Sequence, residues 1–426
     1  MEVLQDTYKD TKVGRIPKDW EVLKIIDIKE NSLLGGNYKN GEGEKGIPLI
    51  KMGNLDRGKI KLNKVQNIPE TLVYDNIHIL KEGDFLFNTR NTLELVGKVA
   101  IWRNELPKAL YNSNLLKIDF NKSKVHSTKF MNYVFNSDLV IKKLRGLATG
   151  STSVAAIYNK DLFKLKVPLP SLPEQQKIAA ILSTVDEQIS TTDKIIKKSK
   201  ELKKGLMQKL FSEGIGHTEF KDTKIGRIPK DWEMVRLGEY SKLMTGGTPN
   251  TKVEEYWDGN IPWMASGDIS KKYIEDVEGR ITELGLQNSA AKFIPVNSIF
   301  IALNGQGKTK GTVAISLKEV TCNQSLAAYV LNEKSFHSLF LFFYLTTRYW
   351  HLRALAGGDD RAGLNLGLLR TVKCPLPTLP EQKKIAAILS QVDAKIEKEQ
   401  TQKAQLEALK KGLMQQLLTG KKRVKV

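Results

Sequence analysis

Hydrophobic residues recur at alternating steps of three and four along two long stretches of the chain, 169–210 and 376–417. This spacing places apolar side chains on one face of a helix, and its heptad-like repeat is typical of a two-helix coiled coil. Polar residues interrupt the first stripe at Thr192 and Ser199. The positions expected to pair the helices are Ile178, Leu182, Val185, Ile189, Ile196, Leu206, Leu210, Ile385, Leu389, Val392, Ile396, Leu406, Leu413 and Leu417.

Both stretches carry signals for helix ends. Pro173 and Pro380 suit the first helical position, where the missing N–H costs nothing, and Glu174 and Glu381 follow where negative charge suits the helix dipole. Gly420 suits the end of the second helix. The pattern predicts two helices of about 37 residues, each roughly 55 Å long.

The two stretches align with each other without a gap, at an offset of about 207 residues. A second repeat relates YKDTKVGRIPKDWE at 8–21 to FKDTKIGRIPKDWE at 220–233, and its Trp20 and Trp232 are expected in the core. The chain therefore reads as one unit duplicated. A long amphipathic helix needs a partner, and the return of the chain through a second domain favours antiparallel pairing within the molecule.

The regions between these repeats are predicted to be globular. Regions 20–168 and 232–375 contain short β-branched and aromatic runs separated by Gly, Asn and Pro, and each ends in a helical patch, 129–145 or 336–355. The expected fold class is α+β, with two pseudo-symmetric globular domains separated by two long helices that form an antiparallel coiled coil. The expected order is a globular domain (1–168), a helix (169–213), a globular domain (214–375), and a helix with a basic tail (376–426).

The two globular regions share landmarks but not surface residues. GIPLIKMGNL at 46–55 parallels NIPWMASGDI at 260–269, while the residues between such landmarks differ. Two copies of one scaffold that present different recognition surfaces would give this pattern.

The charge balance indicates the kind of partner. The chain has 67 Lys and Arg against 47 Asp and Glu, a net charge of +20. This excess favours a polyanionic partner, with nucleic acid ahead of an anionic membrane. The longest apolar run, near 339–345, is too short to span a bilayer, so no membrane partner is expected.

Cysteine and histidine give no sign of a metal site. Cys322 and Cys374 are the only cysteines, they form no CxxC pair, and the five histidines are scattered. The first residues lack the apolar segment of a signal peptide. We therefore expect a reduced, cytoplasmic setting and no metal.

Two segments resemble catalytic motifs, but neither meets the requirements of the motif. ALNGQGKTKG at 302–311 ends like a Walker loop, but Ala302 stands where the first glycine is required, so a basic loop is expected instead. The acidic pair Asp359 and Asp360 aligns with Thr152 and Ser153 of the other half, so carboxylate chemistry is not shared. No hydrolase, methylase or helicase motif is present. We expect no catalytic residue and no cofactor.

The assembled pattern resembles the specificity subunit of type I restriction–modification systems over essentially the whole chain. The most specific parts are PLPSLPEQQKIAAIL at 168–182 and PLPTLPEQKKIAAIL at 375–389, with the helix ends GLMQKL and GLMQQL and the two IPKDW entries. The second region also carries the family-like TGGTPN, where the first has LLGGNYKN; we interpret this difference as a different target rather than a different function.

The resemblance implies a non-enzymatic protein. Its two target recognition domains would each read one half of a split, asymmetric sequence in double-stranded DNA. The paired helices would set the spacing and dock two methyltransferase (modification) subunits, and motor–nuclease (restriction) subunits would join through the complex. A helix of roughly 55 Å spans about 16 base pairs, which agrees with a nonspecific gap between the halves.

Residues that read bases should be polar, lie on loops and differ between the halves. Arg or Lys is expected to contact guanine, and Asn or Gln to contact adenine. The DNA-binding candidates are Lys51, Asn54, Asn88, Thr89, Arg90, Asn91, Asn112 and Asn114 in the first region, and Ser266, Asp268, Asn304, Gln306, Lys308, Lys310, Asn323 and Gln324 in the second.

Two alternatives remain open from the sequence. A coiled-coil scaffold without sequence reading would explain the helices but not two divergent basic domains. A nuclease with an unrecognised site would require Mg²⁺-dependent cleavage by the chain alone.

Overall fold

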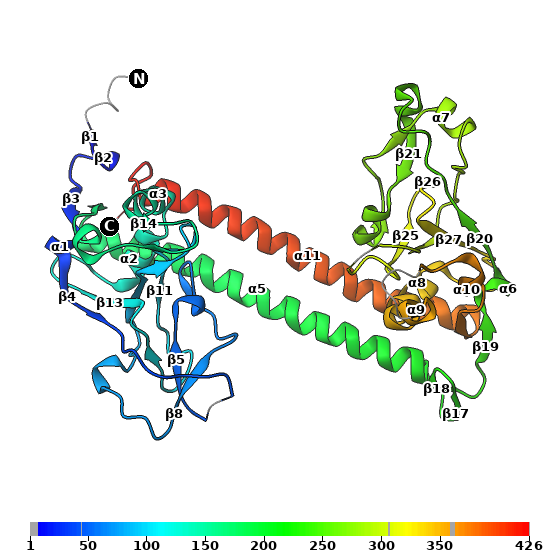
Figure 1. Ribbon diagram of the computed structural model, residues 1–426, viewed down its shortest axis with the longest axis horizontal. Coiled ribbons are helices and arrows are strands. Elements are labelled where there is room, and N and C mark those ends of the chain that lie inside the picture. Colours follow the sequence, from blue (N-terminus) through cyan, green and yellow to red (C-terminus); the bar gives the residue numbers. More distant parts are fainter. Residues whose placement is uncertain (1–6, 44, 306, 358–362, 426) are drawn as a thin grey trace. The chain divides into compact units, whose positions relative to one another are not determined.

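The computed structural model describes residues 7–43, 45–305, 307–357 and 363–425 of the chain. The chain divides into two compact units, Met1–Asp193 with Thr401–Val426, and Lys194–Gln400. Both boundaries fall inside the long helices α5 (Leu172–Glu213) and α11 (Leu379–Leu417), which Figure 1 shows as continuous. Each unit therefore combines one globular region with a segment of both helices.

The first unit is built on a four-stranded antiparallel sheet of order β11-β9-β13-β4, formed by Val99–Ile101, Phe85–Asn88, Leu115–Phe120 and Lys29–Leu34. Two three-stranded sheets join it. They are β12-β5-β8 (Leu110–Tyr111, Gly46–Ile50, Gln66–Pro69) and β10-β15-β14 (Arg90–Asn91, Ala155–Ala156, Thr149–Gly150). The paired strands are β1 (Tyr8–Thr11) with β2 (Gly14–Pro17), β3 (Glu21–Lys24) with β16 (Lys166–Leu169), and β6 (Leu55–Asp56) with β7 (Lys59–Ile60).

The helices of the first unit are short apart from its segments of α5 and α11. They are α1 (Ile25–Ile28), α2 (Thr128–Phe135), α3 (Asp138–Leu147), α4 (Asn159–Leu162) and the 3₁₀ turns η1 (Met52–Asn54) and η2 (Asn76–His78).

The second unit has a related plan, although its described residues form no counterpart of the β10-β15-β14 sheet. Its five-stranded sheet has the order β20-β27-β24-β25-β22, formed by Ser241–Thr245, Leu326–Leu331, Ile299–Ala302, Val313–Ser316 and Tyr273–Ile274. A three-stranded sheet contains β23 (Arg280–Ile281), β21 (Trp257–Met264) and β26 (Thr321–Cys322). The pairs are β17 (Phe220–Thr223) with β18 (Gly226–Pro229) and β19 (Glu233–Arg236) with β28 (Lys373–Leu376).

The second unit also contains short helices. They are α6 (Leu237–Tyr240), α7 (Glu283–Gln287), α8 (Ser338–Thr347), α9 (Tyr349–Leu355), α10 (Leu366–Arg370) and the 3₁₀ turns η3 (Glu254–Tyr256) and η4 (Ser266–Lys271). Along the chain, α7 lies between these 3₁₀ turns and α8.

The long helices run antiparallel within each unit. In the first unit Lys403 pairs with Asp193 at 2.7 Å and Lys410 with Asp186 at 2.6 Å, so the residue number rises along α11 as it falls along α5. In the second unit Lys203 pairs with Asp393 at 2.5 Å, and the Ile215 N–H donates to the Glu381 carboxylate at 2.9 Å. The predicted α+β architecture and the antiparallel pairing of the two helices are confirmed.

The apolar stripes do more than join the two helices. Ile178, Leu182 and Leu417 lie in the core of the first unit with Trp20, and Leu210, Ile385 and Leu389 lie in the core of the second with Trp232. Of the other predicted pairing residues, Val185, Ile196 and Ile396 are buried, while Ile189, Val392, Leu206, Leu406 and Leu413 are half-buried. The end of each stripe thus anchors a globular region on the helices.

Helix α8 shows how the apolar run near 339–345 is accommodated. Phe340 to Leu345 are all buried in the core of the second unit, so the helix is covered on every side. Across the residues that the structure describes, no helix is both long and apolar enough to cross a membrane.

Candidate nucleic-acid interface

A buried carboxylate ties the start of one long helix to the end of the other. In the first unit Glu174 is 1% exposed and accepts a hydrogen bond from the Trp20 indole N–H at 3.0 Å. Arg423, three residues beyond Gly420, donates to Glu174 at 2.8 and 3.0 Å and to both oxygens of Asp19 at 2.9 and 2.8 Å. The hydrogen bond from Arg423 lowers the pKa of Asp19 below its usual value. We call these four side chains the first-unit clasp.

The second unit has an equivalent arrangement, with a histidine in place of the arginine. The Trp232 indole N–H donates to Glu381 at 3.1 Å, and His217, three residues beyond Gly214, lies 3.0 Å from Glu381 and 3.8 Å from Asp231. Gly214 and Gly420 both have positive φ. A Cβ at Gly214 would lie 2.6 Å from Glu381 and 2.8 Å from Trp232, and a Cβ at Gly420 would overlap the Pro17 side chain. The basic tail thus supplies a structural residue, Arg423.

The glutamine that follows each glutamate carries a second shared network. Gln175 accepts from the His126 N–H at 2.9 Å and donates to the Lys124 and Pro170 carbonyls, both at 2.9 Å. Gln382 makes the same three bonds with His337, Ser335 and Pro377. The Pro-Glu-Gln identity between the halves therefore reflects hydrogen bonds that position the segment before α2 or α8.

A tyrosine hydroxyl reinforces a Lys–Asp pair in each unit. Tyr133 donates to Asp186 at 2.7 Å, and Lys410 lies over the Tyr133 ring. In the second unit Lys203 lies over Phe343, which has no hydroxyl, and Tyr273 donates to Asp393 at 2.8 Å instead. Both units therefore have a tyrosine hydroxyl bonded to the aspartate of the pair, although Tyr133 lies on α2 and Tyr273 on β22.

The sequence pattern does not predict the hydrogen bonds and ion pairs of these side chains. It assigns Glu174 and Glu381 only a favourable interaction with the helix dipole, and it assigns no role to Gln175, Gln382 or Asp186. The available signal was their identity between two halves whose surfaces otherwise differ.

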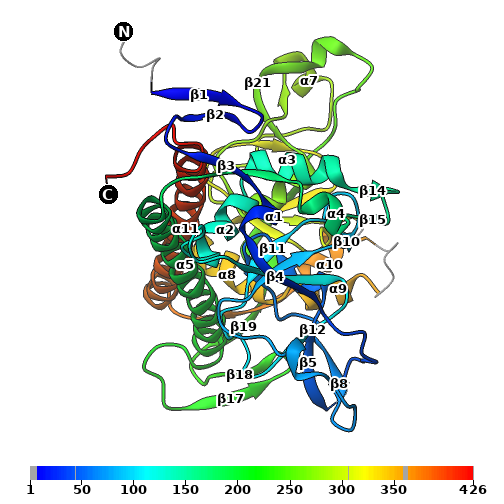
Figure 2. The same ribbon diagram turned by 90° about the vertical axis from the view of Figure 1, so that its left-hand side faces the viewer.

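Three of the predicted DNA-binding residues of the first unit line one hollow. Thr89, Arg90 and Asn114 line a space of about 700 Å³ beside β10 and β15. Arg90 is exposed, whereas the Thr89 hydroxyl donates to the Asn114 carbonyl at 2.9 Å. Figure 2 shows β10, β14, β15 and α4 together at one edge of this unit.

The other predicted residues of the first unit hold turns. Asn54 is buried and accepts from the Lys51 N–H at 3.0 Å, while the Lys51 ammonium donates to Gln66 at 2.8 Å. Asn88 is buried and accepts from the Arg90 N–H at 3.2 Å. The side chains of Asn91 and Asn112 are half-buried, and that of Asn91 accepts from the Thr92 N–H. No observation tests DNA contact by these residues, which stays a prediction.

Several predicted residues of the second unit also hold turns. Asp268 accepts from the Ala265 N–H at 3.0 Å, as Asn54 does in the first unit, and Ser266 precedes it in η4. Asn323 accepts from the Ser325 N–H at 3.1 Å. Gln324 is exposed and accepts from the Thr248 hydroxyl at 2.5 Å.

The loop 302–311 joins β24 to the antiparallel β25, which is not the strand-to-helix connection of a phosphate-binding P-loop. Asn304 and Lys308 are exposed on it, and Lys310 is buried. The Tyr349 hydroxyl donates to the Lys308 carbonyl at 3.0 Å, so α9 holds this loop. Gln306, Asp359 and Asp360 lie outside the described residues.

Equivalent backbone hydrogen bonds frame the exposed positions in both units. The Ile157 N–H donates to the Thr89 carbonyl at 2.9 Å, and Leu364 donates to Leu303 at 2.9 Å. The Asn112 N–H donates to Ile50 at 3.0 Å, and Asn323 donates to Met264 at 3.0 Å. The two units therefore share these framing hydrogen bonds, and the side chains that follow them differ.

Comparisons with known proteins agree with this duplicated scaffold. The family model described as type I restriction modification DNA specificity domain matches the chain twice, over residues 17–201 and 229–408. The MjaX protein of Methanocaldococcus jannaschii, named as a type I restriction enzyme specificity subunit, is 32% identical over 427 residues, which cover 99% of this chain and 98% of that protein.

A second relative and a solved structure extend the comparison. The type I restriction enzyme MjaVIII specificity subunit of the same organism is 30% identical over 447 residues, covering 99% of this chain and 97% of that protein. The crystal structure of a type I restriction-modification system S subunit from M. genitalium shares the fold, with a TM-score of 0.60 at 17% identity over 93% of this chain and 96% of that chain. The chain therefore belongs to the family of type I restriction–modification DNA specificity subunits.

Proposed function

We propose that this chain is the DNA sequence-recognition subunit of a type I restriction–modification complex. Each globular region reads one half of a bipartite, asymmetric site, and the paired helices set the spacing between the halves. The observation that carries the proposal is the shared scaffold with unlike exposed side chains. A protein that reads two different half-sites needs the same fold twice with different exposed side chains. A scaffold protein that does not read sequence has no such need.

Binding selection tests the proposal. The assembled complex is incubated with random DNA duplexes, and the bound fraction is amplified and sequenced over several rounds. We expect enrichment of two short specific blocks separated by an unspecified gap. Lack of enrichment would support the coiled-coil scaffold instead.

An exposed leucine and a glycine mark a docking position that occurs once in each helix. Leu202 on α5 is 57% exposed and Leu409, its equivalent on α11, is 50% exposed. Gly205 and Gly412 stand three residues further along, on the same helix face. A Cβ built on either glycine meets no described atom within 4 Å, so nothing in the described chain requires a glycine there.

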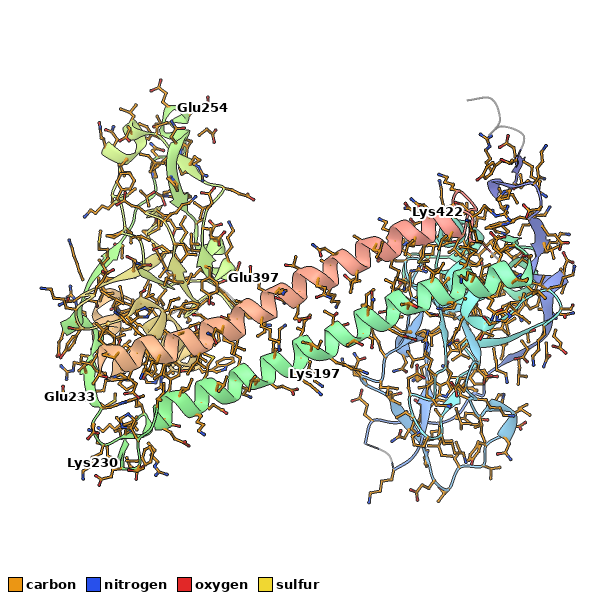
Figure 3. The ribbon with its side chains drawn as sticks, turned by 180° about the vertical axis from the view of Figure 1, so that it is seen from behind. Lys197, Lys230, Glu233, Glu254, Glu397 and Lys422 are labelled. Carbon is orange, nitrogen blue, oxygen red and sulfur yellow. The ribbon has the colours of Figure 1, made fainter. Side chains whose placement is uncertain are left out.

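Glycine inside a helix costs about 1 kcal/mol relative to alanine, so two such glycines need a reason outside the unit itself. Close approach of a partner to the helix backbone supplies one. Because the pair recurs at equivalent positions, we infer that each copy docks one of two identical modification subunits. Figure 3 labels Lys197 on α5 and Glu397 on α11, two exposed charged side chains of the long helices.

We propose further that the chain contributes recognition and assembly, and that its partners carry the chemistry. In support, four buried or half-buried carboxylates in the described chain, Glu174, Glu381, Asp186 and Asp393, are each engaged in a structural contact. Incubation of the purified chain with labelled duplex and Mg²⁺ tests this. The DNA should remain intact, and cleavage would revive the nuclease interpretation.

A further inference from the structure

The hollow beside β10 occupies a position suited to reading DNA. Strands β14 and β15, of two residues each, form a short hairpin at the edge of the β10-β15-β14 sheet, and its connecting residues 151–154 are exposed. The major groove of B-DNA is about 12 Å wide and admits a two-stranded β-ribbon. Arg90 pairs with Ala156 beside this hairpin, and its side chain is exposed.

The side chains around this hollow are cationic and polar. Arg90 and Lys160 supply two positive charges, and the lining contains no carboxylate. Tyr158, which is 52% exposed, and Ser113 add hydroxyl groups. Arg90 and Lys160 form no ion pair within the described chain, so both charges remain available to a ligand.

The backbone bonds that frame the hollow identify the equivalent positions of the second unit. Arg90 follows Thr89 as Asn304 follows Leu303, and Tyr158 follows Ile157 as Asn365 follows Leu364. By the same count Ser113 corresponds to Gln324 and Lys160 to Gly367. The set of two cations and two hydroxyl groups in the first unit is thus replaced by three amides and a glycine.

This exchange separates base reading from backbone binding. The DNA backbone is the same for both units, so a phosphate contact would be needed in both, and neither cation has a counterpart in the second unit. Arginine makes a bidentate contact with O6 and N7 of guanine, and asparagine or glutamine makes the corresponding contact with adenine. A site that changes from arginine to amides on one scaffold changes its preferred purine.

Resting on the proposed function, we propose that this position is a specificity-determining site in both units. Arg90 reads a guanine, with Tyr158 and Lys160 beside it, and Asn304 with the neighbouring Gln324 reads an adenine in the other half-site. Asn365 instead caps α10, since its side chain accepts from the Leu368 N–H at 3.0 Å. The proposal adds Ser113, Tyr158 and Lys160 to the residues that face DNA.

Binding selection by the assembled complex with Arg90→Gln tests the assignment. We expect the wild type to require guanine at one position of one half-site, and the variant to lose that preference by about ten- to a hundredfold while the other half-site is unchanged. Arg90→Lys keeps the positive charge but loses the planar guanidinium and its paired donors, so it should also lose most of the preference for guanine. Arg145→Gln, an exposed arginine on α3, is the matched control and should leave both half-sites unchanged.

The reciprocal variant is Asn304→Ala, which should relax an adenine in the other half-site only. The unchanged half-site in each variant reports that the chain is folded and assembled. A uniform loss of binding on all sequences, or an unchanged preference for guanine, would overturn the assignment to Arg90. A wild-type complex that selects no bipartite motif would instead contradict the proposed function itself.

Discussion

At the scale of single residues, Arg423 beyond the end of α11 supplies the charged partner of a buried carboxylate in the first unit. Glu174 is 1% exposed and relies on Trp20 and Arg423 for its hydrogen bonds. Arg423→Ala removes the charged partner and leaves Glu174 with the indole alone. We expect the first unit to lose about 2 kcal/mol of unfolding free energy, less than for a fully buried pair because Arg423 is partly exposed.

Hydrogen exchange of the full chain under native conditions measures this effect within the first unit. Lys422→Ala, the exposed neighbour in the same tail, is the control and should change protection by less than about 0.5 kcal/mol. Equal protection in the two variants would show that the clasp does not stabilise the unit.

At the scale of elements, α5 contains two leucines with opposite environments. Leu182 is fully buried in the core of the first unit, and Leu202 is 57% exposed. Leu182→Ala should cost about 3 kcal/mol, because it leaves a cavity where the helix enters the core. Leu202→Ala should cost less than about 0.5 kcal/mol in the isolated chain. Denaturant unfolding compares the two, and similar costs would contradict the assignment of these faces.

The same helix shows how far the sequence could predict the fold. Its apolar spacing and its Pro and Glu start signals predict the helix, the repeat at 376–417 predicts its partner, and the return of the chain through a second domain favours the antiparallel order. It could not show that Leu182 enters a globular core, since a coiled-coil seam and a domain contact have the same period. The sequence also could not show that Asn54 stabilises a turn while the Arg90 side chain is exposed, because both are polar residues expected on loops. The distinction depends on backbone partners distant in sequence, such as the Ile157 to Thr89 bond that frames Arg90.

At the scale of the whole molecule, the duplicated docking position predicts stoichiometry. Leu202→Glu or Leu409→Glu alone should leave one of two equivalent positions intact, so each single variant should bind one modification subunit per chain and the double variant none. Native mass spectrometry of the co-expressed complex counts the subunits. Lys200→Glu, an exposed substitution on α5, is the control and should retain two. A single variant that still binds two modification subunits would contradict this docking position.

The central claim is that one chain directs modification to a site made of two different halves. Mapping methylated adenines across the genome of a host that carries the complete modification complex tests it most directly. The account predicts one asymmetric motif with two specific blocks and a fixed unspecified gap, which disappears when this chain is deleted. A single uninterrupted motif, or a methylation pattern independent of this chain, would contradict it.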